Sequence, residues 1–292
     1  MLKIFLFFKI QLRNKFYLII NRKFLNSDTI KVQLLYINIT LKLKIQLVYL
    51  LMVLEPLEFL NGVLTFIAVV INIVFGLLIT LRYFKTKEKE FLYVGIAIAG
   101  IYQPWWPTAV AFLSIIITGN ELAPAIYFFI AIFFIPIFIT LWMLAMNQLL
   151  FKGKRKFLPI IYLIISVLMD IYLVFYLVND PNVIGHLTGP FDSEYGLIMM
   201  LYLLFILSSI VIMGIWFALK SLKIENPEIK LKAKFLILGF IFYLIGGFFD
   251  VGIVSLTAAT LVIARTILIL SSLFIYIGFL LPSPIKKLLI KE

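Results

Sequence analysis

The feature that most constrains this chain is a series of seven apolar windows, each of about twenty residues or more, that follow residue 56. A helix needs about twenty apolar residues to cross the hydrocarbon core of a bilayer. In lipid a spanning segment must also satisfy its backbone hydrogen bonds internally, and these windows are too long for barrel strands. The expected helices cover residues 59–83, 91–118, 122–151, 157–178, 195–219, 235–256 and 259–281.

Composition supports this interpretation. Hydrophobic residues make up 64% of the 292 residues and charged residues 14%, whereas soluble domains are about half apolar and a quarter charged. The seven windows and their short connections use nearly all of the chain, so we expect one seven-helix transmembrane domain over residues 52–285 and a short basic tail, 286–292. The absence of cysteine excludes disulfides, thiolate metal sites and cysteine nucleophiles.

Basic residues alternate between the connections. The first, third and fifth connections and the tail carry Arg82, Lys85, Lys87, Lys89, Lys152, Lys154, Arg155, Lys156, Lys220, Lys223, Lys230, Lys232, Lys234, Lys286, Lys287 and Lys291. The second, fourth and sixth connections carry none. By the positive-inside rule the N-terminal side of the domain lies outside and the C-terminus is cytoplasmic. The formal charge of +12 therefore indicates a lipid bilayer as partner and not nucleic acid.

Residues 1–51 depart from this pattern. They contain nine Lys or Arg and no Gly, Ala or Pro, and nine basic residues outside would contradict the positive-inside rule. We therefore expect translation to start at Met52, with residues 1–51 being upstream sequence of an A/T-rich genome read in frame. The alternative is a basic segment on the membrane surface, or a poor additional span.

Capping residues and prolines mark two helix ends near the expected cytoplasmic side. Asn226-Pro227-Glu228 combines a capping residue, a first-turn proline and a first-turn acid, so the sixth helix should begin there, before the bilayer. Pro282 and Pro284 should end the seventh helix, and residues 285–289 then form a short interfacial segment.

Two ionisable residues face each other across the sixth connection. Asp250 lies six residues before the expected outer end of the sixth helix, and Arg265 lies six residues after the start of the seventh. At about 1.5 Å per residue both lie ~9 Å below the outer surface. They are placed to pair, either as a structural salt bridge or as a ligand-sensing site that faces an outer cavity.

Other polar residues are expected at membrane depth. Asp170 lies about eight residues below the outer end of the fourth helix, where it can join the same polar centre or bond Ser208 or Ser209. In the second helix, Pro104 and Pro107 should produce a kink. The kinked stretch and its neighbour supply the remaining candidates for a pocket: Gln103, Trp105, Trp106 and Asn72. Asn72 is expected to bond Gln103, and the two indoles either line a pocket or simply pack.

The longest outer connection, residues 179–194, holds Asp180, His186, Asp192 and Glu194. Their spacing matches no metal-ligand motif, so we interpret this connection as a solvated acidic loop. We expect no metal site, cofactor or catalytic residue in the chain.

Residues 141–284 have a recognisable layout. A helix ends at the basic turn 151–156, a long outer loop follows, the basic stretch 230–234 begins the sixth helix, and the last helix ends at Pro282. In this layout about half of the chain resembles the seven-helix sensor region that precedes the kinase in some bacterial and archaeal histidine kinases. It is also similar to uncharacterised seven-helix membrane proteins of archaea. The resemblance implies sensing, and because the sequence stops at Glu292, where the kinase would begin, output through a cytoplasmic signalling partner.

The sequence leaves several functions open in the cell membrane. The first is a receptor-like sensory or regulatory protein with a polar pocket near the outer leaflet, open to an unknown small ligand. The second is a small-solute transporter, because discontinuous helices form transporter sites. An intramembrane aspartyl protease would use Asp170 and Asp250, but both lack the glycine-x-glycine-aspartate context. Residues 259–281 contain no lysine for a retinal Schiff base.

Overall fold

The structure is a computed structural model that describes residues 32–41, 54–250 and 257–290. The chain divides into two units, Met1–Tyr49 and Leu50–Glu292. The described part of the first unit is the helix Val32–Leu41, which is shorter than a membrane crossing requires. The prediction that translation starts at Met52 lies outside the described residues. So do the alternatives for the rest of the segment before it.

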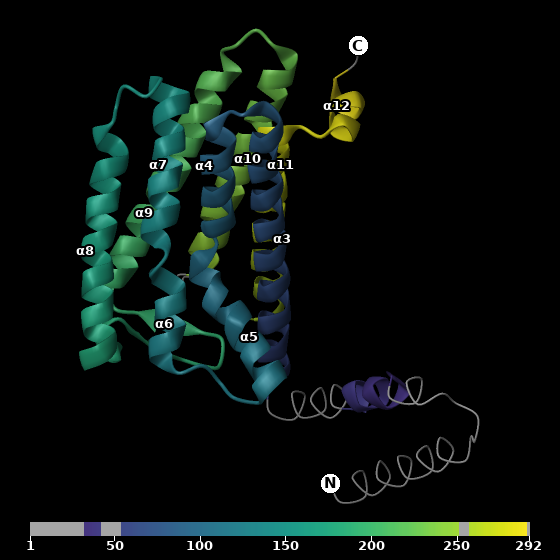
Figure 1. Cartoon of the computed structure of the whole chain (residues 1–292), viewed down its shortest axis with the longest axis vertical. Coiled ribbons are helices and arrows are strands. Elements are labelled where there is room, and N and C mark those ends of the chain that lie inside the picture. Colours follow the sequence, from purple (N-terminus) through teal and green to yellow (C-terminus); the bar gives the residue numbers. More distant parts are fainter. Residues whose placement is uncertain (1–31, 42–53, 251–256, 291–292) are drawn as a thin grey trace, which may run out of the picture. The chain divides into compact units, whose positions relative to one another are not determined.

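The second unit consists of long apolar helices and one small hairpin (Figure 1). Its elements are α3 (Pro56–Thr86), α4 (Lys89–Gly100), η1 (Gln103–Trp105), α5 (Trp106–Thr118), α6 (Pro124–Ile132), α7 (Ile135–Phe151), α8 (Phe157–Asn179), η2 (Pro181–Val183), β1 (Gly185–Leu187), β2 (Ser193–Tyr195), α9 (Leu197–Leu222), α10 (Pro227–Asp250), α11 (Ala258–Leu280) and α12 (Ser283–Leu289).

Six helical stretches of the described chain are long and apolar enough to cross a membrane: α3, α6 with α7, α8, α9, α10 and α11. The chain is therefore a multi-pass helical membrane protein. The remaining expected segment, residues 91–118, forms the two shorter apolar helices α4 and α5 on either side of η1. Figure 1 shows α4 and α5 together following the length of α3.

Prolines break two of the apolar segments. The predicted kink in the second segment is confirmed, since α4 ends at Gly100 and α5 begins at Trp106. The break between α6 and α7, at Phe133 and Phe134, was not predicted. Pro136 in the first turn of α7 explains it, because proline has no amide hydrogen and its ring clashes with the carbonyl four residues earlier.

The predicted start of the sixth helix is confirmed. α10 begins at Pro227, and Asn226 Oδ1 accepts hydrogen bonds from the amides of Glu228 (2.9 Å) and Ile229 (3.2 Å). α11 ends at Leu280, before the predicted prolines, and the short helix α12 follows. Residues 251–256, the end of the expected sixth helix, lie outside the described ranges.

Glycines bring neighbouring helices into backbone contact. A Cβ atom added to Gly95 of α4 would lie 2.4 Å from the backbone nitrogen of Thr80, and one added to Gly76 of α3 would lie 2.5 Å from that of Ala99. On α10, Gly239 has the same role against α11, since an added Cβ would lie 2.9 Å from the backbone nitrogen of Ile275. The Gly239 carbonyl also accepts a hydrogen bond of 2.9 Å from Ser271 Oγ. Small residues permit such close approach between membrane helices.

The second unit has two chemically different ends (Figure 1). At one end lie the α3–α4, α7–α8 and α9–α10 connections and α12, and we call it the basic end. At the other lie the α5–α6 connection, the β1–β2 hairpin and the start of α11, and we call it the hairpin end. The predicted charge alternation therefore corresponds to a physical separation of charge.

Candidate functional site

The predicted ion pair is present at the hairpin end. Arg265 Nη1 donates to both carboxylate oxygens of Asp250, at 3.0 and 2.7 Å. The arginine is 4% exposed and the Asp250 side chain 24% exposed. α10 supplies the carboxylate and α11 the guanidinium, and the two helices pack along each other. A charge at such a depth is tolerated only with a partner, which each of these residues provides for the other.

The ion pair belongs to a larger network that the sequence did not indicate. Arg265 Nη2 donates to Asn61 Oδ1 of α3 at 3.1 Å, and Thr65 Oγ1 donates to the same oxygen at 3.0 Å. Asn61 Nδ2 in turn donates to Asp192 Oδ1 at 2.9 Å. We call Asp250, Arg265, Asn61 and Asp192 the outer network.

The connection that carries Asp192 is a structured hairpin packed into the helices, so its interpretation as a solvated loop is wrong. β1 and β2 pair antiparallel with Leu187 opposite Ser193. Phe191, in the turn, is buried, and its carbonyl accepts hydrogen bonds from Thr108 Oγ1 (2.9 Å) and Tyr127 Oη (3.1 Å). These bonds to α5 and α6 hold the hairpin where Asp192 reaches Asn61. His186 and Glu194 remain exposed.

The predicted tandem of tryptophans divides between two environments. Trp105 Nε1 donates to Asp250 Oδ2 at 2.5 Å, so this indole extends the outer network to η1. Trp106 packs against Phe138 of α7 with the ring centroids 5.6 Å apart. The first indole therefore touches the polar site, whereas the second is a packing residue.

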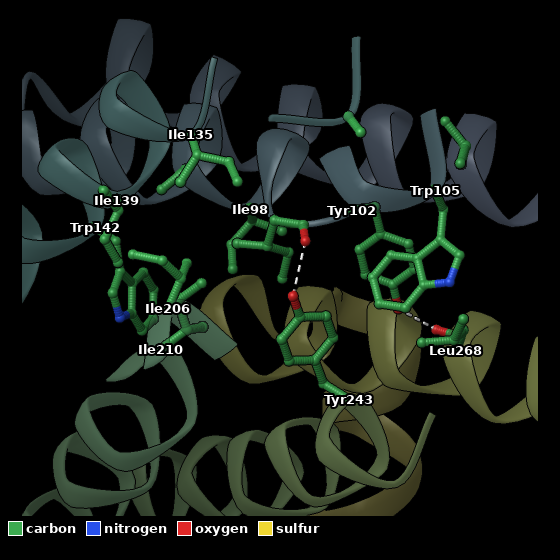
Figure 2. Packing of buried hydrophobic residues seen from close by; sticks show 14 of the residues in the cluster. Ile98, Tyr102, Trp105, Ile135, Ile139, Trp142, Ile206, Ile210, Tyr243 and Leu268 are labelled. Atoms are coloured by element: carbon green, nitrogen blue, oxygen red, sulfur yellow. Dashed lines mark hydrogen bonds between the residues drawn. The ribbon is translucent and has the colours of Figure 1, made fainter. Parts of the chain in front are cut away.

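Two tyrosines connect the broken helix to α10 and α11. Tyr243 Oη donates to the carbonyl of Ile101 at 2.7 Å, and Tyr102 Oη donates to the carbonyl of Leu268 at 2.5 Å. Both rings lie beside Trp105, with centroids 6.1 and 5.2 Å from it. Figure 2 shows this aromatic group between the two layers of helices, with Trp105 at one side of it.

Asn72 and Gln103 do not bond each other, contrary to the prediction. Asn72 Nδ2 donates to the carbonyls of Ile98 (2.8 Å) and Ala99 (3.1 Å), and its Oδ1 accepts from Ser272 Oγ at 3.1 Å. These carbonyls lie in the last turn of α4, where a broken helix lacks its own donors. Asn72 therefore stabilises the broken end of α4.

Gln103 joins the two helix breaks. Its Nε2 donates to the carbonyl of Ile130, about one turn before the α6–α7 break, at 3.0 Å. Its Oε1 is buried and makes no hydrogen bond within the described part of the chain. η1 and α6 are in contact, so the two interruptions lie side by side.

Asp170 does not join the outer network. Ser209, one of its two predicted partners, accepts from Tyr162 Oη at 2.8 Å and donates to the carbonyl of Phe205. Asp170 instead lines a depression with residues of α8 and with Phe133. The two aspartates required by a protease therefore have different surroundings.

The outer network contains two carboxyl groups, Asp192 and Asp250, and one cationic group, Arg265. Burial raises the pKa of the Asp192 carboxyl above its ordinary value of 3.8, and the charges of Asp250 and Glu58 act in the same direction. Arg265 opposes the shift. Tyr127 is a further titratable group near this carboxyl. The described residues contain no group of three or more side chains that could hold a metal ion.

No family model, curated protein or solved structure matches the chain.

We expect the contributions of Asp250 and Arg265 to the free energy of unfolding to be strongly coupled. Asp250→Asn should lower the free energy of unfolding by on the order of 3 kcal/mol, because it leaves the buried Arg265 unpaired. Arg265→Gln should lower it less, since the Asp250 side chain that it leaves unpaired is 24% exposed. The double variant should lose less than the sum of the single losses, by about 1 kcal/mol or more. Thermal unfolding of the purified protein in detergent measures all four forms. Additive losses would show that the two residues are not paired.

Asp192 should make stability depend on pH. Because burial raises its pKa, the folded protein keeps the carboxyl proton to a higher pH than the unfolded chain does. The stabilisation that the protonated Asp192 carboxyl gives to the folded protein is complete below the ordinary pKa of 3.8. It is lost as the pH rises through the raised pKa of the folded protein. Thermal unfolding between about pH 4 and 7 should show this decrease in stability in wild type and in the exposed-loop control Glu121→Gln, and a smaller decrease in Asp192→Asn. An equal decrease in Asp192→Asn would contradict the assignment.

Proposed function

We propose that this protein is a receptor-like sensory or regulatory membrane protein, whose outer network responds to a small solute outside the cell. The observation that supports this proposal most directly is the path of hydrogen bonds from Asp192 through Asn61 to Arg265 and Asp250. It connects an extramembrane hairpin to three long helices. A solute that competes for any of these groups changes how the hairpin is held against α3, α10 and α11.

The proposed route of output follows α10 and α11. Both helices run from the outer network to the basic end, where α10 begins. Lys286 Nζ of α12 lies 2.6 Å from Glu228 Oε2, in the first turn of α10. A displacement of the Asp250–Arg265 pair is therefore transmitted to a basic surface that a cytoplasmic signalling partner can bind.

The proposal includes an orientation and a seventh crossing in the cell membrane. The hairpin end is placed outside and the basic end in the cytoplasm, in agreement with the positive-inside rule. The pair α4–α5 is taken as one crossing, because it follows α3 and joins Thr86 at the basic end to Gly119 at the hairpin end. Its central break is acceptable in a membrane since neighbouring side chains satisfy the freed carbonyls.

A small-solute transporter is the alternative, and one observation favours it. Two interrupted helical segments, α4–α5 and α6–α7, meet at Gln103. Substrate sites of secondary transporters are built from discontinuous helices near the middle of the bilayer. The unpaired Oε1 of Gln103 provides an acceptor at this position.

The topology can be tested with single cysteines, since the chain contains none. Cysteines at Thr188 and Glu121 should react with a membrane-impermeant maleimide on intact cells. A cysteine at Lys154 should react only after permeabilisation. All three positions are exposed, so access across the membrane decides the outcome. If Glu121→Cys behaves like Lys154→Cys, α4 and α5 do not form a crossing.

Solute flux distinguishes the two functions. Proteoliposomes of the purified protein should show no uptake of radiolabelled amino acids or short carboxylic acids above that of empty liposomes. Binding of such a solute should instead raise the melting temperature of wild type, and this shift should be lost in Asn61→Ala, which breaks the outer network. Asn120→Ala, on the exposed α5–α6 connection, is the control. Uptake that requires Asp250 would overturn the sensor proposal and support transport.

A further inference from the structure

Asp170 lies in a second, separate site on the exposed side of α8. The side chains of Phe133, Val167, Asp170, Ile171, Val174 and Phe175 surround a shallow depression of about 440 Å³. This volume is within the range of sites for small organic molecules. Five of its six lining residues are apolar, and the exception is a carboxylate.

The Asp170 carboxylate has no cationic partner among the described residues. Its Oδ1 is buried and accepts no hydrogen bond there. Asp250 differs in that its carboxylate has donors, since both Arg265 and Trp105 donate hydrogen bonds to it. An ionisable side chain within a membrane helix is unfavourable unless it is paired, so an unpaired one indicates a missing partner.

Two further polar groups lie near this carboxylate and near each other. Ser166 lies one helical turn before Asp170, and Tyr202 of α9 lies within range of the Asp170 charge. Both hydroxyls are buried, and neither makes a hydrogen bond of normal geometry in the described part of the chain. The depression itself is lined by apolar side chains around one carboxylate, a combination that suits an amphiphilic molecule.

The depression opens where lipid would be. The most apolar window of α8 is only 11% buried, far less than that of any other candidate span. Val174 and Phe175 are 43% and 58% exposed. A molecule that reaches Asp170 by this route must first dissolve in the hydrocarbon region. A metal ion does not fit, because it requires several oxygen ligands and this lining offers one carboxylate.

We propose that this depression binds a lipophilic amine, whose ammonium group pairs with Asp170 and whose apolar part packs against Phe133, Val174 and Phe175. A neutral amine enters from the hydrocarbon region. The proton of the Asp170 carboxylic acid then transfers to the amine nitrogen, and the products are a carboxylate and an ammonium ion in contact. No other reactant is required. The inference does not rest on the outer network or on its proposed role.

A photoreactive amine tests the proposal. The full chain in phosphatidylcholine nanodiscs is incubated with a dimethylalkylamine that carries a benzophenone, and the cross-linked peptides are identified by mass spectrometry. We expect saturable labelling within residues 167–175, which the unmodified amine displaces. An analogue with carbon in place of the nitrogen should not compete. Asp170→Asn should weaken the apparent affinity roughly tenfold or more, since the charge pair is lost.

Two further variants control for folding and location. Val174→Phe fills the depression and leaves Asp170 unchanged, so it should also weaken labelling, even if Asp170→Asn fails to fold. Glu121→Gln alters a carboxyl on the exposed α5–α6 connection and should label like wild type. Labelling that both Asp170→Asn and Val174→Phe leave unchanged overturns the proposal. The proposal would also be overturned if amine labelling does not require Asp170 while cross-links between two copies of the chain do. A basic helix of the second copy would then be the occupant.

Discussion

Arg265 carries the interaction on which the hairpin end depends. Its guanidinium is buried, and it reaches Asp250 on α10 and Asn61 on α3 from α11. Taking an arginine out of water is unfavourable by several kcal/mol unless strong hydrogen bonds replace the lost solvation. The positions of these helices at the hairpin end are therefore tied to one another by the need to satisfy one cation. Asp192 adds the hairpin to this set through Asn61.

A second constraint acts deeper in the unit, where prolines interrupt two helices. Lipid supplies no hydrogen-bond partners, so carbonyls freed by a break must find donors within the protein. Asn72 provides two donors to the end of α4, Tyr243 provides one to Ile101, and Gln103 provides one to Ile130. These polar side chains thus have a structural reason to lie at membrane depth. Trp105 joins this region to the outer network, so the two constraints act on the same segment, η1.

The sequence predicted the features that depend on local pattern. Apolar length located the long helices, and equal depth on two antiparallel neighbours placed Asp250 opposite Arg265. It did not predict Asn61 or Asp192 as partners of this pair. Asn61 lies near the start of an apolar segment, where one amide is unremarkable, and Asp192 reaches it only because the hairpin folds back into the helices. The one available signal for the α6–α7 break was Pro136, which has the same effect as Pro104 and Pro107.

The two intramembrane aspartates show what pairing does to the functional role of a charge. Asp250 has a guanidinium and an indole as donors, so its charge is already used in holding α10, α11 and η1 together. A ligand at Asp250 must compete with these contacts, which couples binding there to the positions of the helices, as the proposed sensor role requires. Asp170 holds nothing in the described structure, and a ligand there gains the full interaction without displacing a protein group. Binding at Asp170 can therefore be tight without a conformational response, whereas binding at the outer network is coupled to one. In the two proposals, the paired residue therefore serves the recognition of external signals, and the unpaired one serves simple occupancy from the membrane.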